Sequence, residues 1–176
     1  PSRGLGDVYK RQDMSYEEGA MIEPLAVAVH GVKQMGDVAG MNIAVLGAGP
    51  IGNLVAQAAK GMGAAKVMIT DISDLRLAKA KECGIDVCVN TKNKDFGAAM
   101  LEAFGPDKAD VIYDCAGNNI TMGQAIKYAR KGSTIVLVAV FAGMAEVDLA
   151  VANDHELDIK STMMYRHDDY IDGIRL

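Results

Sequence analysis

The sequence of 176 residues has no tryptophan, and only 5% of its residues are aromatic. A hydrophobic core must therefore be built from aliphatic side chains and from the 11 methionines. Because 50% of the residues are hydrophobic, a chain of this length can bury the core of one α/β domain without a disulfide or a structural metal.

Cysteine is also scarce. Cys83, Cys88 and Cys115 have the spacing of neither a zinc knuckle nor a disulfide framework, so we expect reduced thiols. No apolar run reaches the ~20 residues that a bilayer span needs. The N-terminus lacks the apolar stretch of a signal peptide. These features predict a soluble, cytoplasmic protein that does not act at a membrane.

Basic charge is in deficit, with 18 Lys and Arg against 23 Asp and Glu and a net charge of -5. Since phosphate binding needs a basic face, this balance argues against a nucleic-acid partner. Residues 1–12 differ from the rest because they are basic and have no helical or strand period, so we interpret them as foreign to the natural protein. Residues 166–176 begin a helical pattern without an end signal, which predicts that the natural protein continues.

Strands and helices alternate along most of the chain. Ser15 and Glu18 have the spacing of a capping box, which predicts a helix to about Met35. Short apolar runs predict strands at residues 42–46, 66–70, 86–89, 110–113, 133–140 and 159–164, and helical spacing predicts helices at 51–62, 73–82, 96–104 and 120–129. This α/β alternation predicts a doubly wound parallel sheet, the Rossmann fold, with its ligand beyond the carboxyl ends of the strands.

A glycine-rich turn joins the first predicted strand to the next helix. Gly47 permits a tight turn, Gly49 lets the backbone approach a pyrophosphate, and Gly52 allows close helix packing. Pro50 suits the first helical turn, and Ile51 follows it there. The free amides at the start of this helix favour a phosphate ligand.

Asp71 ends the second predicted strand, where an acid can accept hydrogen bonds from the adenosine ribose. A carboxylate there also repels a 2'-phosphate, which favours NAD over NADP. The alternative is that Asp71 only caps the following helix. Arg76 on that helix suits stacking on adenine, although it could also neutralise a 2'-phosphate.

From Ser15 to Leu176 the sequence resembles the zinc-containing medium-chain dehydrogenase/reductase family, in particular its sorbitol-type polyol and 2,3-butanediol dehydrogenases. The resemblance is carried by three segments: IEPLAVAVH at 22–30, GAGPIG at 47–52, and DIS followed by RLAKA at 71–80. It implies that Glu23 lies at a catalytic zinc, as a metal ligand or substrate contact.

The resemblance also assigns Val138, Ala139 and Val140, at the end of the fifth predicted strand, to the nicotinamide. Cys115 lies in the loop after the fourth predicted strand, near the expected adenosine ribose, and we interpret it as a packing or lining residue rather than a nucleophile. The segment at 161–167 departs from sorbitol enzymes because Met164 stands where they carry arginine. Tyr165 followed by arginine is instead typical of butanediol enzymes, so polyol and vicinal diol both stay open as substrates.

The activity implied is NAD-dependent oxidation of a secondary alcohol, with zinc stabilising the alkoxide. The other zinc ligands belong to a preceding catalytic domain that is missing here, so we expect the chain to be a fragment of a two-domain dehydrogenase, inactive by itself. We divide it into a lead-in helix at 13–40, an NAD-binding domain at 41–165, and a truncated return to the catalytic domain at 166–176.

Two alternatives share the glycine loop and the acid after the second strand. A Rossmann-like methyltransferase would leave the Glu23-Pro24 step unexplained. A non-enzymatic NAD-sensing module would bind the dinucleotide in the same way but depend on a partner. The resemblance to medium-chain dehydrogenases also implies a homo-oligomer, which we expect to associate through the sheet edge between residues 133 and 164.

Overall fold

The computed structural model describes residues 14–176, so the segment 1–12 interpreted as foreign lies outside the described residues. Six strands form one sheet: β1 (Asn42–Leu46), β2 (Lys66–Asp71), β3 (Val87–Asn90), β4 (Val111–Asp114), β5 (Thr134–Leu137) and β6 (Asp158–Ser161). The helices are α2 (Tyr16–Lys33), α3 (Pro50–Gly61), α4 (Asp74–Glu82), α5 (Phe96–Phe104), α6 (Asn119–Tyr128), α7 (Leu149–Asp154) and α8 (His167–Arg175).

The sheet is parallel throughout, with the order β3-β2-β1-β4-β5-β6. The chain moves outward from β1 to β3 and then returns to add β4 on the other side of β1. The loops after β1 and β4 therefore meet at the carboxyl edge, where strand order reverses. The predicted doubly wound sheet is confirmed.

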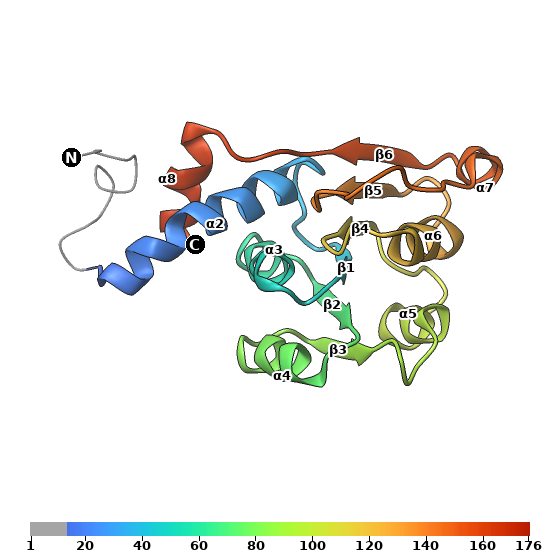
Figure 1. Cartoon of the computed structure of the whole chain (residues 1–176), viewed down its shortest axis with the longest axis horizontal. Coiled ribbons are helices and arrows are strands. Elements are labelled where there is room, and N and C mark those ends of the chain that lie inside the picture. Colours follow the sequence, from blue (N-terminus) through green and yellow to red (C-terminus); the bar gives the residue numbers. More distant parts are fainter. Residues whose placement is uncertain (1–13) are drawn as a thin grey trace.

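Helices cover both faces of the sheet, as Figure 1 shows, with α2, α3 and α4 on one side and α5 and α6 on the other. In β1, Ile43 and Val45 join the core beneath the first group, whereas Ala44 and Leu46 join the core beneath the second. Successive strand residues point to opposite faces. A strand buried on both sides must be apolar at every position, which explains the continuous apolar runs.

The start of α2 follows its predicted capping box. The Ser15 hydroxyl accepts from the Glu18 amide at 3.1 Å, and the Glu18 carboxylate accepts from the Ser15 amide at 2.8 Å. The helix runs to Lys33 and packs beside α8. Within residues 14–176, every helix is too short or too polar to cross a lipid bilayer.

The C-terminal elements β5, α7 and β6 differ from the sequence prediction in three places. Strand β5 ends at Leu137 rather than 140, and β6 ends at Ser161 rather than 164. The residues beyond these ends turn away as loops, which apolar composition alone does not distinguish from strand. The short helix α7 was not predicted, because its six residues give too little periodicity.

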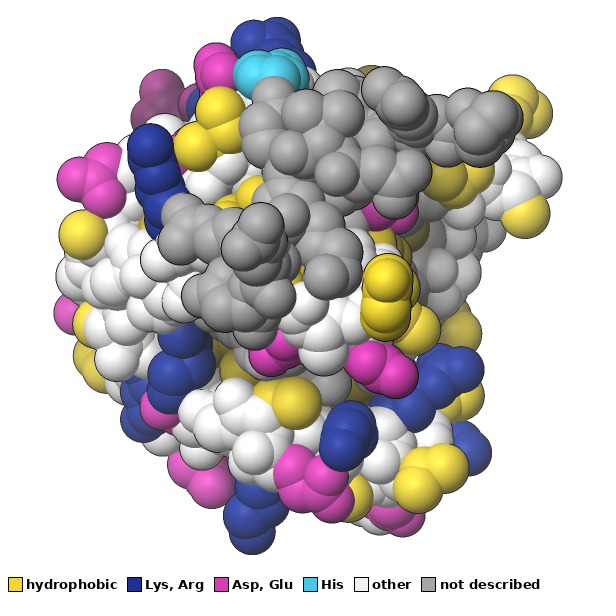
Figure 2. Space-filling model, turned by 90° about the vertical axis from the view of Figure 1, so that its left-hand side faces the viewer, with side chains coloured by type: hydrophobic (Ala, Val, Ile, Leu, Met, Phe, Trp, Pro, Cys, Tyr) yellow, Lys and Arg dark blue, Asp and Glu magenta, His cyan; other side chains and the backbone are white. Residues whose placement is uncertain are grey.

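The side of the molecule that carries α2 and α8 has mixed charge. Among the described side chains in Figure 2, Lys and Arg lie next to Asp and Glu around this side. The described part of this face therefore carries charges of both signs rather than a field of one sign.

Tyr113 links the sheet to α2 through one buried hydrogen bond, from its hydroxyl to the Val32 carbonyl at 3.0 Å. We expect Tyr113→Phe to lower the free energy of unfolding by about 1 kcal/mol, because the ring packing stays and one net hydrogen bond is lost. Urea denaturation measures the change. The half-buried Tyr128→Phe is the matched control and should stay within about 0.5 kcal/mol. Equal stability of Tyr113→Phe and the unchanged chain would contradict the assignment.

Candidate functional site

A cavity of about 400 Å³ opens at the carboxyl edge of the sheet, between the ends of β1, β2 and β4. Five of the predicted cofactor residues line it: Gly47, Gly49, Asp71, Arg76 and Cys115. The sequence analysis missed the rest of the lining, which consists of Thr70, Ile72, Thr91, Ala116, Asn118, Ile120, Thr121 and Gln124. The rule that ligands bind beyond strand ends could have found Thr91 after β3 and Ala116 after β4.

The three glycines differ in what they permit. Gly47 has φ +99°, a backbone conformation that residues with a side chain rarely adopt. A Cβ there would lie 3.2 Å from the Ala116 amide nitrogen. A Cβ on Gly52 would lie 1.9 Å from the Gly47 carbonyl oxygen, so the helix can approach the turn only with glycine. A Cβ on Gly49 would meet no protein atom within 4 Å. The backbone at Gly49 thus faces open space, where a ligand can approach.

Helix α3 begins at this turn without a side-chain cap, since Gly49 is its N-cap and Pro50 occupies the first turn. The amides of an uncapped first turn can bind an anion. The turn therefore has both the space and the hydrogen-bond donors that a diphosphate requires.

The Asp71 carboxylate, only 6% exposed, holds this turn in place. Its Oδ2 accepts from the Ala48 amide at 2.8 Å, and its Oδ1 accepts from the amides of Ile72 and Ser73 at 2.8 and 2.9 Å. Arg76 Nη1 lies 3.6 Å from Oδ2. The structure thus shows Asp71 anchoring the glycine turn and binding the two amides that precede α4 while it lines the cavity. It does not cap α4, whose N-cap is Ser73 and whose first amides receive no side-chain hydrogen bond.

A second buried carboxylate, Asp114 at the end of β4, organises the opposite wall. Its Oδ1 accepts from the amides of Ala116 and Gly117, both at 3.0 Å, and its Oδ2 accepts from the Thr121 hydroxyl at 3.1 Å. Sequence reasoning gave Asp114 no role. The signal that could have found it is its place at a strand end, like that of Asp71.

A second cavity of about 320 Å³ adjoins the first and shares Cys115 and Ala116 with it. Its lining holds the predicted residues Ile51, Cys115, Val138, Ala139 and Val140, together with Val27, Thr162, Met163 and Met164. The amides of Val138 and Ala139 both donate to the Asp114 carbonyl at 2.9 Å, which bends the chain out of β5. The residues after β5 therefore reach the cavity as loop backbone, not as strand core.

Cys115 stands between the two cavities. Burial raises the pKa of its thiol, and the nearby Asp114 raises it further. A thiol with a raised pKa stays protonated, so this geometry suits a lining residue better than a nucleophile.

Met164 has a left-handed backbone, with φ +58°. For a residue other than glycine this conformation costs roughly 1 to 2 kcal/mol. Thr162, Met163 and Met164 form the wall of the second cavity on the β6 side. The strain is thus located where the chain passes from β6 toward α8, beside a candidate site.

Glu23 and Tyr165 do not line these two cavities. Glu23 is exposed on α2, one turn before Val27, which does line the second cavity. The Tyr165 ring packs edge-on against Tyr170, with centroids 4.9 Å apart. Burial raises the pKa of Tyr170, helped by a hydrogen bond with Tyr165 and by the negative charge of Glu23. The three side chains are therefore neighbours at the α2–α8 contact.

Residues 14–176 contain no cluster of three or more His, Cys, Asp or Glu side chains that could hold a metal ion. The residues described here thus do not make a zinc site, because Glu23 offers a single carboxylate where zinc takes at least three protein ligands. Any zinc at Glu23 would need further ligands from outside residues 14–176.

Comparison with known proteins points to one family. Residues 50–176 match the family model described as zinc-binding dehydrogenase. The chain is similar to sorbitol dehydrogenase of Ovis aries, with 39% identity over 160 residues that cover 89% of this chain and 45% of that protein. The chain thus spans about half the length of the curated relatives it matches.

Solved structures share the fold. The 2R,3R-butanediol dehydrogenase of Bacillus subtilis is 31% identical with a TM-score of 0.86, over 94% of this chain and 47% of that one. An alcohol dehydrogenase of Escherichia coli, complexed with NADH, is 28% identical with a TM-score of 0.82, over 93% of this chain and 48% of that one. The predicted resemblance to medium-chain zinc dehydrogenases is confirmed.

Gly52 provides a direct test of the close helix approach. We expect Gly52→Ala to lower the free energy of unfolding by about 3 kcal/mol, since the added methyl meets backbone rather than a movable side chain. Gly123→Ala in α6 is the control, because no atom lies within 4 Å of the added Cβ; it should raise stability by about 0.5 to 1 kcal/mol. Thermal or urea unfolding measures both. A Gly52→Ala chain as stable as the control variant would refute the packing.

Proposed function

Because the chain belongs to the zinc-binding dehydrogenase family, we propose that it is the NAD(H)-binding part of an oxidoreductase that acts on the secondary alcohol of a polyol or vicinal diol. The observation that carries the proposal is the pair of adjoining cavities along the β1–β4 crevice, with the glycine turn and Asp71 at one end and residues 138–140 at the other. A crevice at the point where strand order reverses is where doubly wound sheets bind dinucleotides.

The first cavity takes the adenosine half. Gly47, Gly49, Pro50, Ile51 and Gly52 form the turn and first helical residues that face the diphosphate, and Arg76 lies beside the adenine. With three amides already bound, the Asp71 carboxylate keeps capacity for a further donor, because two carboxylate oxygens offer about four acceptor sites. That donor is a ribose hydroxyl. The negative charge of Asp71 disfavours a 2'-phosphate, so the preferred cofactor is NAD.

The second cavity takes the nicotinamide half, against the backbone of Val138, Ala139 and Val140 and beside Cys115. When bound there, the dinucleotide accepts or donates the hydride. The Val and Met residues that line this cavity provide apolar surface around the reacting ring.

The alcohol site lies beyond the nicotinamide, toward Glu23 and Tyr165. We assign Glu23 as one zinc ligand or substrate contact and Tyr165 as a substrate contact, with the other zinc ligands contributed from outside residues 14–176. Sorbitol dehydrogenase and butanediol dehydrogenase are both relatives, so the substrate class stays a polyol or vicinal diol. The relatives reported above are all dehydrogenases, which argues against the methyltransferase alternative.

Within the whole protein, residues 13–40 lead in from a catalytic domain, 41–165 bind the dinucleotide, and 166–176 return toward that domain. Strand β6 is an edge of the sheet, with pairing to β5 on one side. An edge strand can pair with a second copy, so the proposed homo-oligomer associates through residues 133–164.

The cofactor assignment is tested by titrating the chain with NADH and with NADPH under calorimetry. NADH should bind more tightly, because the Asp71 charge repels the extra phosphate. In Asp71→Asn the ratio of the two affinities should fall about tenfold, equivalent to the loss of one charged contact. Asparagine keeps one acceptor oxygen and so loses the bond from Ala48 or those from Ile72 and Ser73. Any loss of order in the turn weakens both dinucleotides, whereas the NADH-to-NADPH ratio reports the charge.

Asp74→Asn is the matched control, since it removes the same charge from the exposed first turn of α4. Its NADH-to-NADPH ratio should equal that of the unchanged chain. An unaltered ratio in Asp71→Asn, or no binding of either dinucleotide to the unchanged chain, would reject the assignment.

We expect no alcohol oxidation by this chain alone, because the described residues cannot hold zinc. The assay mixes the chain with zinc, NAD and either sorbitol or 2,3-butanediol, and follows NADH absorbance. Sheep sorbitol dehydrogenase with sorbitol serves as the positive control. Steady NADH production by the chain would overturn the expectation that catalysis needs residues from elsewhere.

A further inference from the structure

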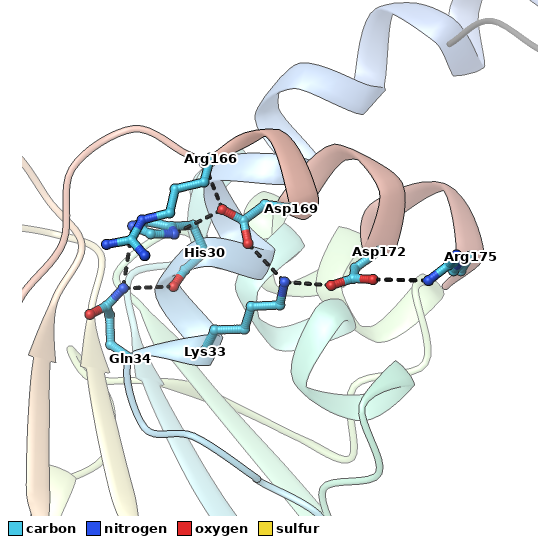
Figure 3. A network of polar contacts seen from close by, with 7 residues as sticks. All are labelled: His30, Lys33, Gln34, Arg166, Asp169, Asp172 and Arg175. Atoms are coloured by element: carbon cyan, nitrogen blue, oxygen red, sulfur yellow. Dashed lines mark hydrogen bonds and ion pairs between the residues drawn. The ribbon is translucent and has the colours of Figure 1, made fainter.

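Two carboxylates of α8, those of Asp169 and Asp172, bind Lys33 of α2, whose Nζ donates to Asp172 Oδ2 at 2.5 Å. Asp169, whose side chain is 3% exposed, projects from the first turn of α8 onto the last turns of α2, as Figure 3 shows. Its Oδ2 lies 2.8 Å from His30 Nδ1, and its Oδ1 accepts from Lys33 Nζ at 2.9 Å. We call His30, Lys33 and Asp169 the Asp169 latch.

The same carboxylate also sets the start of α8. Its Oδ2 accepts from the Arg166 amide at 2.7 Å, which caps the helix. Burial by itself raises the pKa of Asp169, but the hydrogen bonds from Lys33 and the Arg166 amide, with the charge of Lys33, bring it below its ordinary value. The group is therefore ionised at neutral pH, where charge-assisted hydrogen bonds are strong. The latch thus fixes the point at which the chain enters α8.

Residues 162–164, in the loop that precedes Arg166, form one wall of the second cavity. At its other end the Thr162 amide donates to the Leu137 carbonyl at 3.1 Å, so β5 holds the loop there. Between these two anchors lies Met164 with its left-handed backbone. A strained conformation persists only when its surroundings hold it, and here these include the β5 ladder, the latch and the packing of Tyr165 on α8.

We propose that Asp169 is a positioning residue for the nicotinamide half of the dinucleotide. None of the three latch residues lines either cavity, yet the latch holds residues 162–164 against the second one. This proposal rests on the proposed binding of NAD(H). If Asp169 no longer binds α2, residues 162–164 adopt the arrangement that binds nicotinamide for only a fraction of the time. The apparent affinity for NADH then falls by that fraction. The adenosine half, on the far side of Cys115, is unaffected.

The test compares NADH with ADP-ribose, which carries the adenosine half and the diphosphate but no nicotinamide. Calorimetry measures the dissociation constants of both for the unchanged chain and for Asp169→Asn. We expect Asp169→Asn to weaken NADH about tenfold and ADP-ribose by less than about twofold. A merely structural loss would weaken both ligands together, so the ratio separates positioning from general destabilisation.

Asp168→Asn is the matched control, because it removes the same charge from the neighbouring residue in the first turn of α8. Both of its dissociation constants should equal those of the unchanged chain. If Asp169→Asn does not fold by circular dichroism, the pair His30→Leu and Lys33→Met carries the test. Neither new side chain can donate to the α8 carboxylates, and Asp169 keeps its bond from the Arg166 amide. The same selective loss of NADH affinity is expected.

The proposal would be overturned if the latch variants changed the dissociation constants of NADH and ADP-ribose by the same factor, or changed neither, because the ratio of the two would then equal that of the unchanged chain. Equal dissociation constants of NADH and ADP-ribose for the unchanged chain would also overturn it, because the second cavity would then contribute nothing to the affinity for NADH. Failure of the unchanged chain to bind ADP-ribose would instead reject the proposed function. The two failures are therefore distinguishable.

Discussion

The parallel pairing of β1 with β4 is the constraint on which the rest of this structure depends. It places Val45 beside Tyr113 and Leu46 beside Asp114, so the loops that follow the two strands meet at one edge. The glycine turn then lies against Ala116, and the two cavities open on either side of this contact. A different strand order would separate the same residues, because each loop follows its own strand.

Two buried carboxylates hold the loops in the shapes that this pairing allows. Asp71 binds the Ala48 amide across the sheet edge, and Asp114 binds the amides of its own loop. Each stays buried because backbone amides satisfy its acceptors, which offsets the cost of removing a charge from water. Asp71 thereby combines a structural task with its proposed contact to ribose, so a preference for one cofactor and the order of the glycine turn depend on the same side chain.

The described residues supply the proposed dinucleotide site far more completely than the proposed alcohol site. Glycine amides, Asp71, Arg76 and residues 138–140 converge from four segments of the sheet edge, whereas Glu23 stands exposed on α2. The contact of α2 with α8 connects the two sides. It brings Glu23 near Tyr165 and Tyr170, and through Asp169 it fixes the start of α8, just after the loop that lines the second cavity.

The sequence by itself determined the alternation of strands and helices, the glycine turn, the capping box at Ser15 and the family, because each of these depends on residues that are close along the chain. It did not determine where β5 and β6 end, the helix α7, or the roles of Asp114 and Asp169. Those depend on which backbone groups lie across a sheet edge or between two helices. His30 and Asp169 are 139 residues apart, and only the packing of α8 on α2 makes them partners.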